Sequence, residues 1–138
     1  GMGGLRQVSF GLMDMRWHSA NPSNIKDVAK FEDEATADTR LFPRLAGPMS
    51  TSFSHIFAGG YAAGYYSYKW AEVLDADTFE LFEEEGLYNQ ETAQKYIDEV
   101  LSRGGSEPPA VLYRRFRGRD ADPDALLRRE GLLKEKAA

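Results

Sequence analysis

The sequence predicts an all-α fold, a compact array of about six helices in a single helical domain over residues 1–138. Apolar residues recur at intervals of three and four in several stretches, which is the spacing of one face of a helix. The period-two alternation typical of half-buried strands is missing, and so are Asn-Gly hairpin turns. Proline and glycine divide the chain into segments of helical length.

The composition is that of a globular protein and argues against several classes. Hydrophobic residues make up 42% and charged residues 28%, as in ordinary soluble domains. No run approaches the roughly 18 apolar residues of a membrane span, and the first residues lack the basic and apolar regions of a signal peptide. Cysteine is absent, which excludes disulfides and favours a cytoplasmic location. The net charge of −5 argues against nucleic acid as a partner.

The first helix is expected over residues 5–19 and is apolar nearly all round, which predicts burial by several neighbours. Its apolar residues lie on two sides, Leu5, Val8 and Leu12 on one and Phe10, Met13 and Trp17 on the other. His18 stands at its end, where the helix dipole favours a cation. We interpret His18 as a hydrogen-bonded structural histidine and not as a metal ligand.

A second helix is expected over residues 25–41, with Ser23 or Asn24 as its N-cap. Pro43 ends it, because proline restricts the preceding residue and cannot continue the helix. Residues 45–54, which include Gly47-Pro48, form a loop. The inward residues of this helix are Ile25, Val28, Ala29 and Ala35.

The longest helix is expected to begin near Tyr61 and to end at Gly86, a good left-handed cap. At about 100° per residue, Tyr61, Tyr65 and Tyr68 fall on one stripe, which Glu72 and Asp75 continue. The opposite face is apolar and is the expected core face: Ala63, Tyr66, Trp70, Val73, Leu74 and Leu81. The tyrosines therefore face away from the core. Spacing alone leaves open whether they pack against a second element or serve a site.

Three shorter helices complete the array, over residues 90–103, from Pro108-Pro109 to residue 116, and over residues 124–130. Asn89 caps the first of them, and Asp122-Pro123 starts the last. The inward residues are Ala93, Tyr96, Ile97, Val100 and Leu101 in the first, and Val111, Leu112 and Phe116 in the second.

Charges separate along the second half of the chain. Ten acidic residues and one lysine lie between Glu72 and Glu99, whereas eight basic and five acidic residues lie between Tyr113 and Lys136. This pattern fits two solvated faces of opposite sign. The alternative is that the basic stretch docks on the acidic helix or on another part of a larger protein.

Residues 53–70, Phe-Ser-His-Ile-Phe-Ala-Gly-Gly-Tyr-Ala-Ala-Gly-Tyr-Tyr-Ser-Tyr-Lys-Trp, concentrate site chemistry as no other stretch does. From His55 through Leu74 the chain resembles the C-terminal part of the thimet oligopeptidase family of zinc metallopeptidases, and most of all its oligopeptidase A branch. The resemblance extends to residues 5–18, 101–106, 116–119 and 125–132, and so covers nearly the whole chain. It implies the fold of the C-terminal part of a zincin-like oligopeptidase catalytic domain.

The resemblance also implies a peptide-binding role for this stretch. In that family the corresponding histidine and tyrosines line the cleft opposite the zinc, contact the substrate backbone and donate hydrogen bonds to the carbonyl oxygen under attack. The implied catalytic residues are His55, Tyr65 and Tyr68, and the implied substrate-binding residues are Tyr61, Gly59 and Gly60. A phenol keeps its proton at neutral pH and can therefore donate to a developing oxyanion. Paired glycines give a loop the freedom to close over a substrate.

One departure from the family is decisive for activity. A zinc peptidase site of this kind needs His-Glu-x-x-His on a helix, but this chain has only His18 and His55, and neither is followed by Glu. No metal ligand is therefore expected in this chain, and zinc belongs to the full family domain. We expect the chain alone to be inactive, with short peptides and the zinc-bearing part of the domain as its partners.

Two other functions remain open from the sequence. The chain fits a non-catalytic peptide-binding or assembly module derived from the family, and it fits a plain helical domain whose tyrosine stripe is a homodimer seam. The first helix and the tyrosine face are both expected to expose apolar surface, which favours a homo-oligomer.

Overall fold

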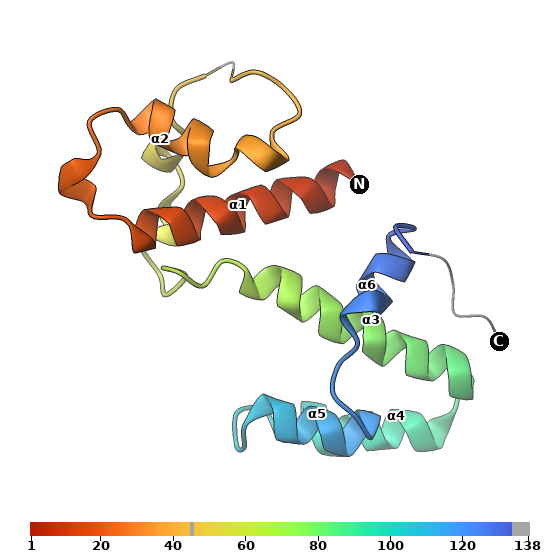
Figure 1. Ribbon diagram of the computed structural model, residues 1–138. Coiled ribbons are helices and arrows are strands. Elements are labelled where there is room, and N and C mark those ends of the chain that lie inside the picture. The colour runs from red at the N-terminus through yellow and green to blue at the C-terminus, as the bar shows by residue number, and fades with distance from the viewer. Residues whose placement is uncertain (45, 134–138) are drawn as a thin grey trace. The chain divides into compact units, whose positions relative to one another are not determined.

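The computed structural model describes residues 1–44 and 46–133, and every regular element in them is helical (Figure 1). No strand occurs among these residues, so the predicted all-α fold class is confirmed. The six α-helices of the described residues are α1 (Met2–Ser19), α2 (Val28–Ala35), α3 (Ser67–Glu85), α4 (Gln90–Tyr96), α5 (Pro109–Arg117) and α6 (Pro123–Arg129). They are joined by 3-10 turns and by one π-helical segment, Ile97–Leu101.

The chain divides into two compact units, Gly1–Lys69 and Trp70–Ala138, with the boundary inside α3. Each unit has its own cluster of buried apolar side chains. The sequence predicts a single domain, and the division into two compact units does not test that prediction. None of the helices in the described ranges is both long and apolar enough to cross a membrane.

In the first unit, α1 packs against α2 and against the chain that follows α2. The core joins Phe10 and Met13 of α1 to Phe53 and Ile56, which come from the segment before α3. These are the buried apolar residues of this unit, and removal of their apolar surface from water favours its folding.

The two predicted sides of the first helix differ in the structure. The side with Phe10, Met13 and Trp17 faces the interior, and the Trp17 ring lies 4.5 Å from the ring of Phe31 in α2. On the other side Val8 and Leu12 remain 44% and 42% exposed. Burial of the whole circumference is therefore wrong for this unit, because α2 and the later segment cover one side only.

The second helix is shorter than the sequence predicts. It begins at Val28, where Asp27 and not Ser23 or Asn24 is the N-cap, with its Oδ1 accepting the Lys30 amide at 3.0 Å. It ends at Ala35 because the Thr36 hydroxyl donates to the Glu32 carbonyl at 2.8 Å, and a separate 3-10 turn, Ala37–Thr39, follows. Val28, predicted to face inward, is 36% exposed. Of the predicted loop 45–54, residue 45 lies outside the described residues, and Met49–Thr51 forms a 3-10 turn.

The longest helix begins at Ser67, six residues later than predicted from Tyr61. Ala63 has φ 54°, and Gly59 and Gly60 have φ 85° and 86°, which are left-handed conformations that a right-handed helix cannot contain. Helical periodicity therefore does not apply to Tyr61 or Tyr65.

The predicted core face of this helix is confirmed only in its later part. Val73 and Leu81 are buried, whereas Tyr66 is 59% and Trp70 50% exposed. Tyr66 precedes the helix, so its predicted place on the core face was wrong. The helix ends before Gly86, at φ 106°, as predicted.

In the second unit, α3 packs against α6 through Val73, Ala76, Ala125 and Leu126. Asn89 caps α4 as predicted, since its side chain accepts the Glu91 amide at 2.9 Å. Predicted inward residues Ile97 and Leu101 are instead 44% and 62% exposed. They lie in the π-helical segment, which turns less per residue than an α-helix and so moves them off the inward face.

The last two helices begin and end close to their predicted bounds. Pro109 opens α5, whose inward residues Leu112 and Phe116 are buried together with Tyr113. Asp122 caps α6 by accepting the Asp124 amide at 3.0 Å. Gly131, at φ 71°, follows the end of α6.

The docking alternative for the charged segments is confirmed within this unit. Asp77 of α3 is fully buried and accepts hydrogen bonds from Tyr113 Oη at 2.6 Å and from Arg119 at 2.5 Å. Further ion pairs join α3 to the basic residues of α5 and α6: Arg117 to Glu84, Arg128 to Glu80 and Arg129 to Asp75. The basic residues of this stretch that follow residue 133 lie outside the described residues, so docking cannot be assigned to them.

Candidate functional site

Four predicted site residues meet in the first unit, and we call His55, Tyr61, Tyr65 and Tyr68 the tyrosine cluster. The Tyr61 and Tyr68 rings stack with centroids 5.3 Å apart, and the Tyr65 and Tyr68 rings lie 5.1 Å apart. The His55 ring is 5.9 Å from Tyr61 and 6.5 Å from Tyr65. The sequence predicted these neighbours correctly, although a turn and not a helix brings them together.

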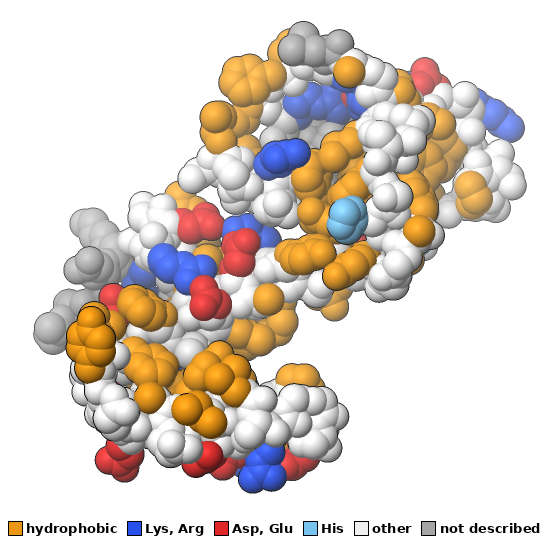
Figure 2. Space-filling view, turned by 180° about the vertical axis from the view of Figure 1, so that it is seen from behind, with side chains coloured by type: hydrophobic (Ala, Val, Ile, Leu, Met, Phe, Trp, Pro, Cys, Tyr) orange, Lys and Arg blue, Asp and Glu red, His pale blue; other side chains and the backbone are white. Residues whose placement is uncertain are grey.

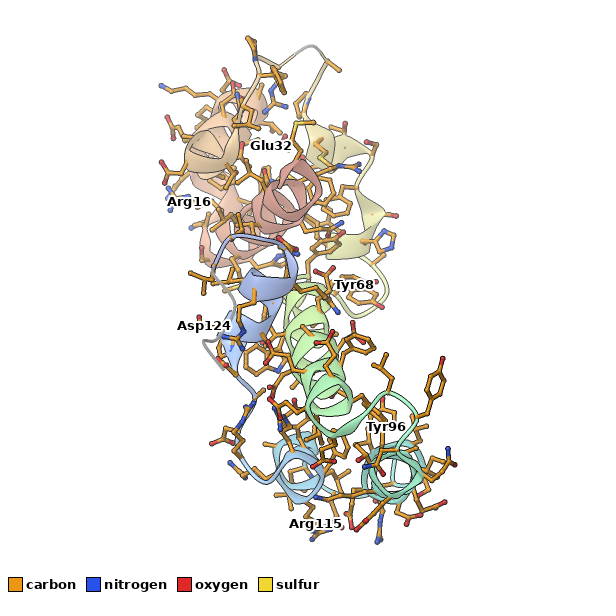
Figure 3. The ribbon with its side chains drawn as sticks, turned by 90° about the vertical axis from the view of Figure 1, so that its right-hand side faces the viewer. Arg16, Glu32, Tyr68, Tyr96, Arg115 and Asp124 are labelled. Carbon is orange, nitrogen blue, oxygen red and sulfur yellow. The ribbon has the colours of Figure 1, made fainter. Side chains whose placement is uncertain are left out.

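The tyrosine cluster is open to solvent at one edge. Tyr68, in the first turn of α3, is 39% exposed, and Figure 3 shows its position at the start of that helix. His55 is exposed, and Tyr61 and Tyr65 are half-buried. The four rings are therefore partly exposed to solvent and are not sealed in the core.

Buried neighbours fix His55 beside the tyrosines. His55 lies in the 3-10 turn Ser54–Ile56, whose flanking residue Phe53 and last residue Ile56 are both buried. Phe57, the residue after this turn, is 52% exposed and does not serve as a second anchor, whereas Ile56 is fully buried. The turn presents its middle residue outward because the two apolar ones occupy the core.

Gly59 and Gly60 connect this turn to the tyrosines in a conformation that favours glycine. Both have positive φ, and an added Cβ would meet no other atom within 4 Å. Glycine is therefore required here by backbone conformation and not by crowding. Their role in substrate binding stays a prediction.

Sequence reasoning did not single out Asp14, the residue of α1 whose side chain accepts hydrogen bonds from the backbone of this segment. Asp14 is fully buried, and its Oδ1 and Oδ2 accept the amides of Ala63 at 3.0 Å and Tyr65 at 2.9 Å. An acidic residue within an apolar helical pattern was the available signal, because a buried carboxylate needs hydrogen-bond donors.

His18 is hydrogen-bonded as predicted. Its Nδ1 lies 2.9 Å from the Asp14 carbonyl oxygen and 2.8 Å from Asp14 Oδ1. His18 therefore supports Asp14 from the next turn of the same helix.

Tyr68 holds its proton more firmly than an ordinary phenol. A hydrogen bond with Tyr61, together with partial loss of solvent and the nearby Tyr65, raises the pKa of Tyr68 above its ordinary value of 10.0. A group in this state donates a hydrogen bond without first having to gain a proton.

A second buried carboxylate of the first unit, Glu32 of α2, holds a different loop. It accepts the amides of Met49 at 2.7 Å and Ser50 at 2.9 Å, and Arg44 donates to it at 3.2 Å. Figure 3 shows Glu32 apart from Tyr68 within this unit. Burial by itself raises the pKa of Glu32, but the hydrogen bonds from Ser50, Met49 and Arg44 outweigh it and lower the pKa below 4.5.

The described residues do not fit a zinc site. Among residues 1–44 and 46–133, no three His, Cys, Asp or Glu side chains lie together as metal ligands would. Of the two histidines, His18 directs its Nδ1 at Asp14 and His55 stands among phenols, which are not usual zinc ligands. No chemical step of this chain is therefore assigned to a metal.

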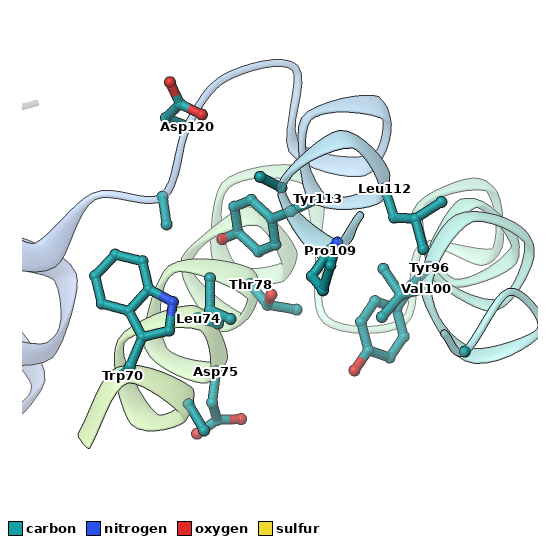
Figure 4. A pocket seen from close by; sticks show the side chains of 14 residues that line it. Trp70, Leu74, Asp75, Thr78, Tyr96, Val100, Pro109, Leu112, Tyr113 and Asp120 are labelled. Carbon is teal, nitrogen blue, oxygen red and sulfur yellow. The ribbon is translucent and has the colours of Figure 1, made fainter. Parts of the chain in front are cut away.

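A pocket of about 460 Å³ lies within the second unit (Figure 4). Trp70 and Leu74 of α3 line one side, and Tyr96 and Val100 line the other. The pocket is mainly apolar, and the carboxylates on its rim already pair with arginines, Asp75 with Arg129 and Asp120 with Arg114. It contains none of the predicted site residues.

Comparison with known proteins agrees with the resemblance drawn from the motif. Oligopeptidase A of Haemophilus influenzae is 49% identical over 133 residues, which cover 94% of this chain and 19% of that protein. Oligopeptidase A of Escherichia coli is 49% identical over 130 residues, 93% of this chain and 19% of that protein. Dipeptidyl carboxypeptidase of Salmonella typhimurium is 40% identical over 128 residues, 91% of this chain and 19% of that protein.

The chain thus spans only 19% of the length of these relatives. The family model that matches it is described as Peptidase family M3 and covers residues 1–132. Since this match takes in nearly all of the 138 residues, the chain belongs to peptidase family M3.

Proposed function

We propose that this chain is the substrate-binding and oxyanion-stabilising portion of a zinc-dependent oligopeptidase that hydrolyses short peptides. Its membership of peptidase family M3 supports peptide hydrolysis as the activity of the whole protein. Relatives named oligopeptidase A and dipeptidyl carboxypeptidase support short peptides as substrates.

The observation that carries this proposal is the tyrosine cluster. Three phenols and His55 meet at a solvent-accessible edge of the first unit, with ring centroids 5.1–5.9 Å apart between successive members. A peptide backbone offers carbonyl oxygens as acceptors, and phenol hydroxyls are donors of matching chemistry. Gly59 and Gly60 bring the backbone beside the cluster without side chains that would obstruct an extended peptide.

In this proposal Tyr65 and Tyr68 donate hydrogen bonds to the carbonyl oxygen as it gains negative charge. A phenol keeps its proton in the neutral range, so such a hydroxyl is available as a donor to the developing charge. His55 and Tyr61 hold the substrate backbone beside them. Removal of one such donor typically lowers the rate by about 10²–10³.

The chain alone is proposed to be inactive. It lacks the His-Glu-x-x-His sequence that supplies zinc ligands and a general base in peptidases of this kind. The rest of the family domain is therefore the partner that completes the site. Addition of zinc and a short peptide to the isolated chain should give no hydrolysis, and turnover that disappears with a chelator would contradict this.

A chimera tests the role of the tyrosine cluster. The segment of Escherichia coli oligopeptidase A that aligns with this chain is replaced by it, and kcat and KM are measured on a short peptide. We expect an active chimera in which Tyr65→Phe or Tyr68→Phe lowers kcat by about 10²–10³. Tyr88→Phe is the matched control, because Tyr88 is 91% exposed and outside the cluster.

The outcomes separate the alternatives. If the two cluster variants keep the kcat of Tyr88→Phe, the oxyanion role is wrong. If the isolated chain binds the peptide but the chimera has no activity, a non-catalytic peptide-binding module replaces the proposal. If Tyr65→Phe and Tyr68→Phe leave peptide affinity unchanged while the chain is a dimer, the homodimer seam is favoured.

We also propose a cytoplasmic location. The absence of cysteine supports it, since a cysteine-free chain needs no oxidising compartment in order to fold. Cell fractionation with an antibody to this chain would test the location directly.

A further inference from the structure

The backbone of the segment that carries Tyr61 and Tyr65 is hydrogen-bonded to a buried side chain of α1, Asp14. Asp14 uses its two carboxylate oxygens separately, Oδ1 for the Ala63 amide and Oδ2 for the Tyr65 amide, at 3.0 and 2.9 Å. Two bonds to amides two residues apart fix both the position and the direction of the backbone between them. The positions from which the tyrosine side chains project are thereby fixed relative to α1.

The Tyr65 ring of this turn also packs against Phe10 of α1 and Phe53, at 5.8 and 5.2 Å between ring centroids, whereas Asp14 holds its backbone. Within it the Gly64 amide donates to the Tyr61 carbonyl at 2.9 Å, and the Ser67 amide donates to the Gly64 carbonyl at 3.0 Å. Ala63 has φ 54°, a conformation that alanine rarely adopts unless its surroundings impose it. The bond from the Ala63 amide to Asp14 is a contact that imposes it.

Asp14 is itself held in place. It is fully buried, and His18 Nδ1 lies 2.8 Å from the same oxygen that accepts the Ala63 amide. One set of contacts therefore runs from α1 through this carboxylate to the backbone of the turn, beside the direct contact of Phe10 with the Tyr65 ring. Neither Asp14 nor His18 belongs to the tyrosine cluster, and neither has a ring contact with its tyrosines.

We propose that Asp14 is a positioning residue for peptide binding: by fixing the turn from Ala63 to Tyr65, it brings Tyr61 and Tyr65 against Tyr68 and so forms the hydrogen-bonding surface for a peptide backbone. This inference rests on the proposed function of the tyrosine cluster. It adds the residue through which the core of the first unit sets the geometry of that site.

Asp14→Asn tests the proposal in the full chain. The amide side chain has nearly the same shape but offers one acceptor oxygen, and its NH₂ group faces an amide donor. Affinity for an end-blocked peptide of six alanine and glycine residues should fall about tenfold, as expected when a buried donor loses its acceptor. Calorimetric titration measures the affinity.

Glu32→Gln is the matched control. Glu32 is also a buried carboxylate of the first unit that accepts two loop amides, but its loop contains no residue of the tyrosine cluster. This variant should lose stability as Asp14→Asn does and keep the peptide affinity of the unmodified chain. Equal loss of affinity in both variants would overturn the proposal, since general destabilisation would then explain it.

A double-variant cycle asks whether Asp14 acts through the tyrosines. In a chain that already carries Tyr65→Phe and Tyr68→Phe, Asp14→Asn should cause no further loss of affinity. A second full tenfold loss would show an independent contribution and would contradict a positioning role.

A spectroscopic readout is independent of peptide binding. With ¹³C in the tyrosine rings, the titration of Tyr68 is followed by NMR, and its raised pKa should move toward 10.0 in Asp14→Asn but not in Glu32→Gln. If the unmodified chain fails to bind peptide while this shift occurs, the proposed function fails and the positioning role stands. If Tyr68 titrates alike in both variants, the positioning role fails.

A further measurement needs no folded variant. In the unmodified chain the amides of Ala63 and Tyr65 should exchange slowly with solvent, because both donate to Asp14. Rapid exchange of both amides would overturn the inference.

If Asp14→Asn does not fold, Asp14→Glu, which keeps both acceptor oxygens, replaces it and should retain part of the peptide affinity.

Discussion

At the residue scale, three buried carboxylates of the described chain hold loops in place. Asp14 accepts the amides of the turn before α3, Glu32 accepts those of Met49 and Ser50, and Asp77 binds Arg119 and the Tyr113 hydroxyl. A carboxylate removed from water is tolerated only when donors replace its hydration. Each of the three is surrounded by such donors, so each fixes the backbone or side chains that supply them.

Glu32 makes the first unit sensitive to acid. Hydrogen bonds from Ser50, Met49 and Arg44 outweigh the opposing effect of burial, and the pKa of Glu32 in the folded chain lies below its ordinary value of 4.5. The unfolded chain therefore binds the proton more readily. The contribution of Glu32 to stability is fully present above about pH 4.5 and is lost as the pH falls through the lower folded value.

Glu32→Gln should therefore lower the free energy of unfolding at neutral pH by about 1–3 kcal/mol, because one loop amide loses its acceptor. It should also reduce the further loss of stability below about pH 4.5. Urea unfolding at a series of pH values measures both effects. Glu34→Gln is the control, since Glu34 is an exposed residue of the same helix. An acid response equal to that of the unmodified chain would contradict the assignment to Glu32.

At the element scale, α6 is joined to α3 by an apolar contact and by two arginines that differ in burial. Arg128 lies between Glu80 and Asp122, at 2.7 and 2.8 Å, with only 11% of its side chain exposed. Arg129, the next residue, pairs with Asp75, but these side chains are 41% and 71% exposed. The same kind of ion pair, an arginine with a carboxylate, therefore forms once where the side chains are partly buried and once where they are exposed to solvent.

Arg128→Ala should destabilise the second unit by about 3 kcal/mol, because it leaves two partly buried carboxylates without their shared cation. Arg129→Ala should change stability by less than about 1 kcal/mol, as exposed ion pairs usually do. Thermal unfolding of both variants gives the comparison. Similar midpoints for the two variants would show that burial of Arg128 does not strengthen its ion pairs.

At the scale of the whole molecule, the described chain exposes many large apolar side chains. Val8, Leu12 and Met15 of α1 are 44%, 42% and 46% exposed and recur at helical spacing. Figure 2 shows that hydrophobic side chains also gather at the surface on other parts of the face that it views. The exposure predicted for the first helix and for Tyr68 of the tyrosine face is confirmed, whereas self-association stays a prediction.

Light scattering should therefore report a mass that rises with protein concentration, since exposed apolar patches tend to associate. Leu12→Lys should shift this equilibrium toward the monomer. Ser19→Lys adds the same charge at an exposed polar position of α1 and should leave the mass unchanged. A constant monomer mass for the unmodified chain over a wide concentration range would count against association.

The proximity of the four candidate residues was predictable, but the backbone conformation that brings them together was not. His55, Tyr61, Tyr65 and Tyr68 were found from the motif, and the four rings do lie together. The helical wheel that placed the three tyrosines on one stripe was wrong, because the positive φ of Ala63 lies before the helix begins. Left-handed alanine has no sequence signal of its own, since glycine, asparagine and aspartate are the residues that normally mark it.

The sequence by itself determined the all-α class, the end of the longest helix at Gly86, and the caps at Asn89 and Asp122, because these depend on the conformational limits of single residues and their nearest neighbours. It also determined the family, through a motif read directly from neighbouring residues. The tertiary structure decided which side of α1 is buried, where α3 begins and why the phenols meet. Those features depend on contacts between parts of the chain far apart in sequence, such as Phe10 with Phe53 and Asp14 with the amides of Ala63 and Tyr65, and no local periodicity encodes such contacts.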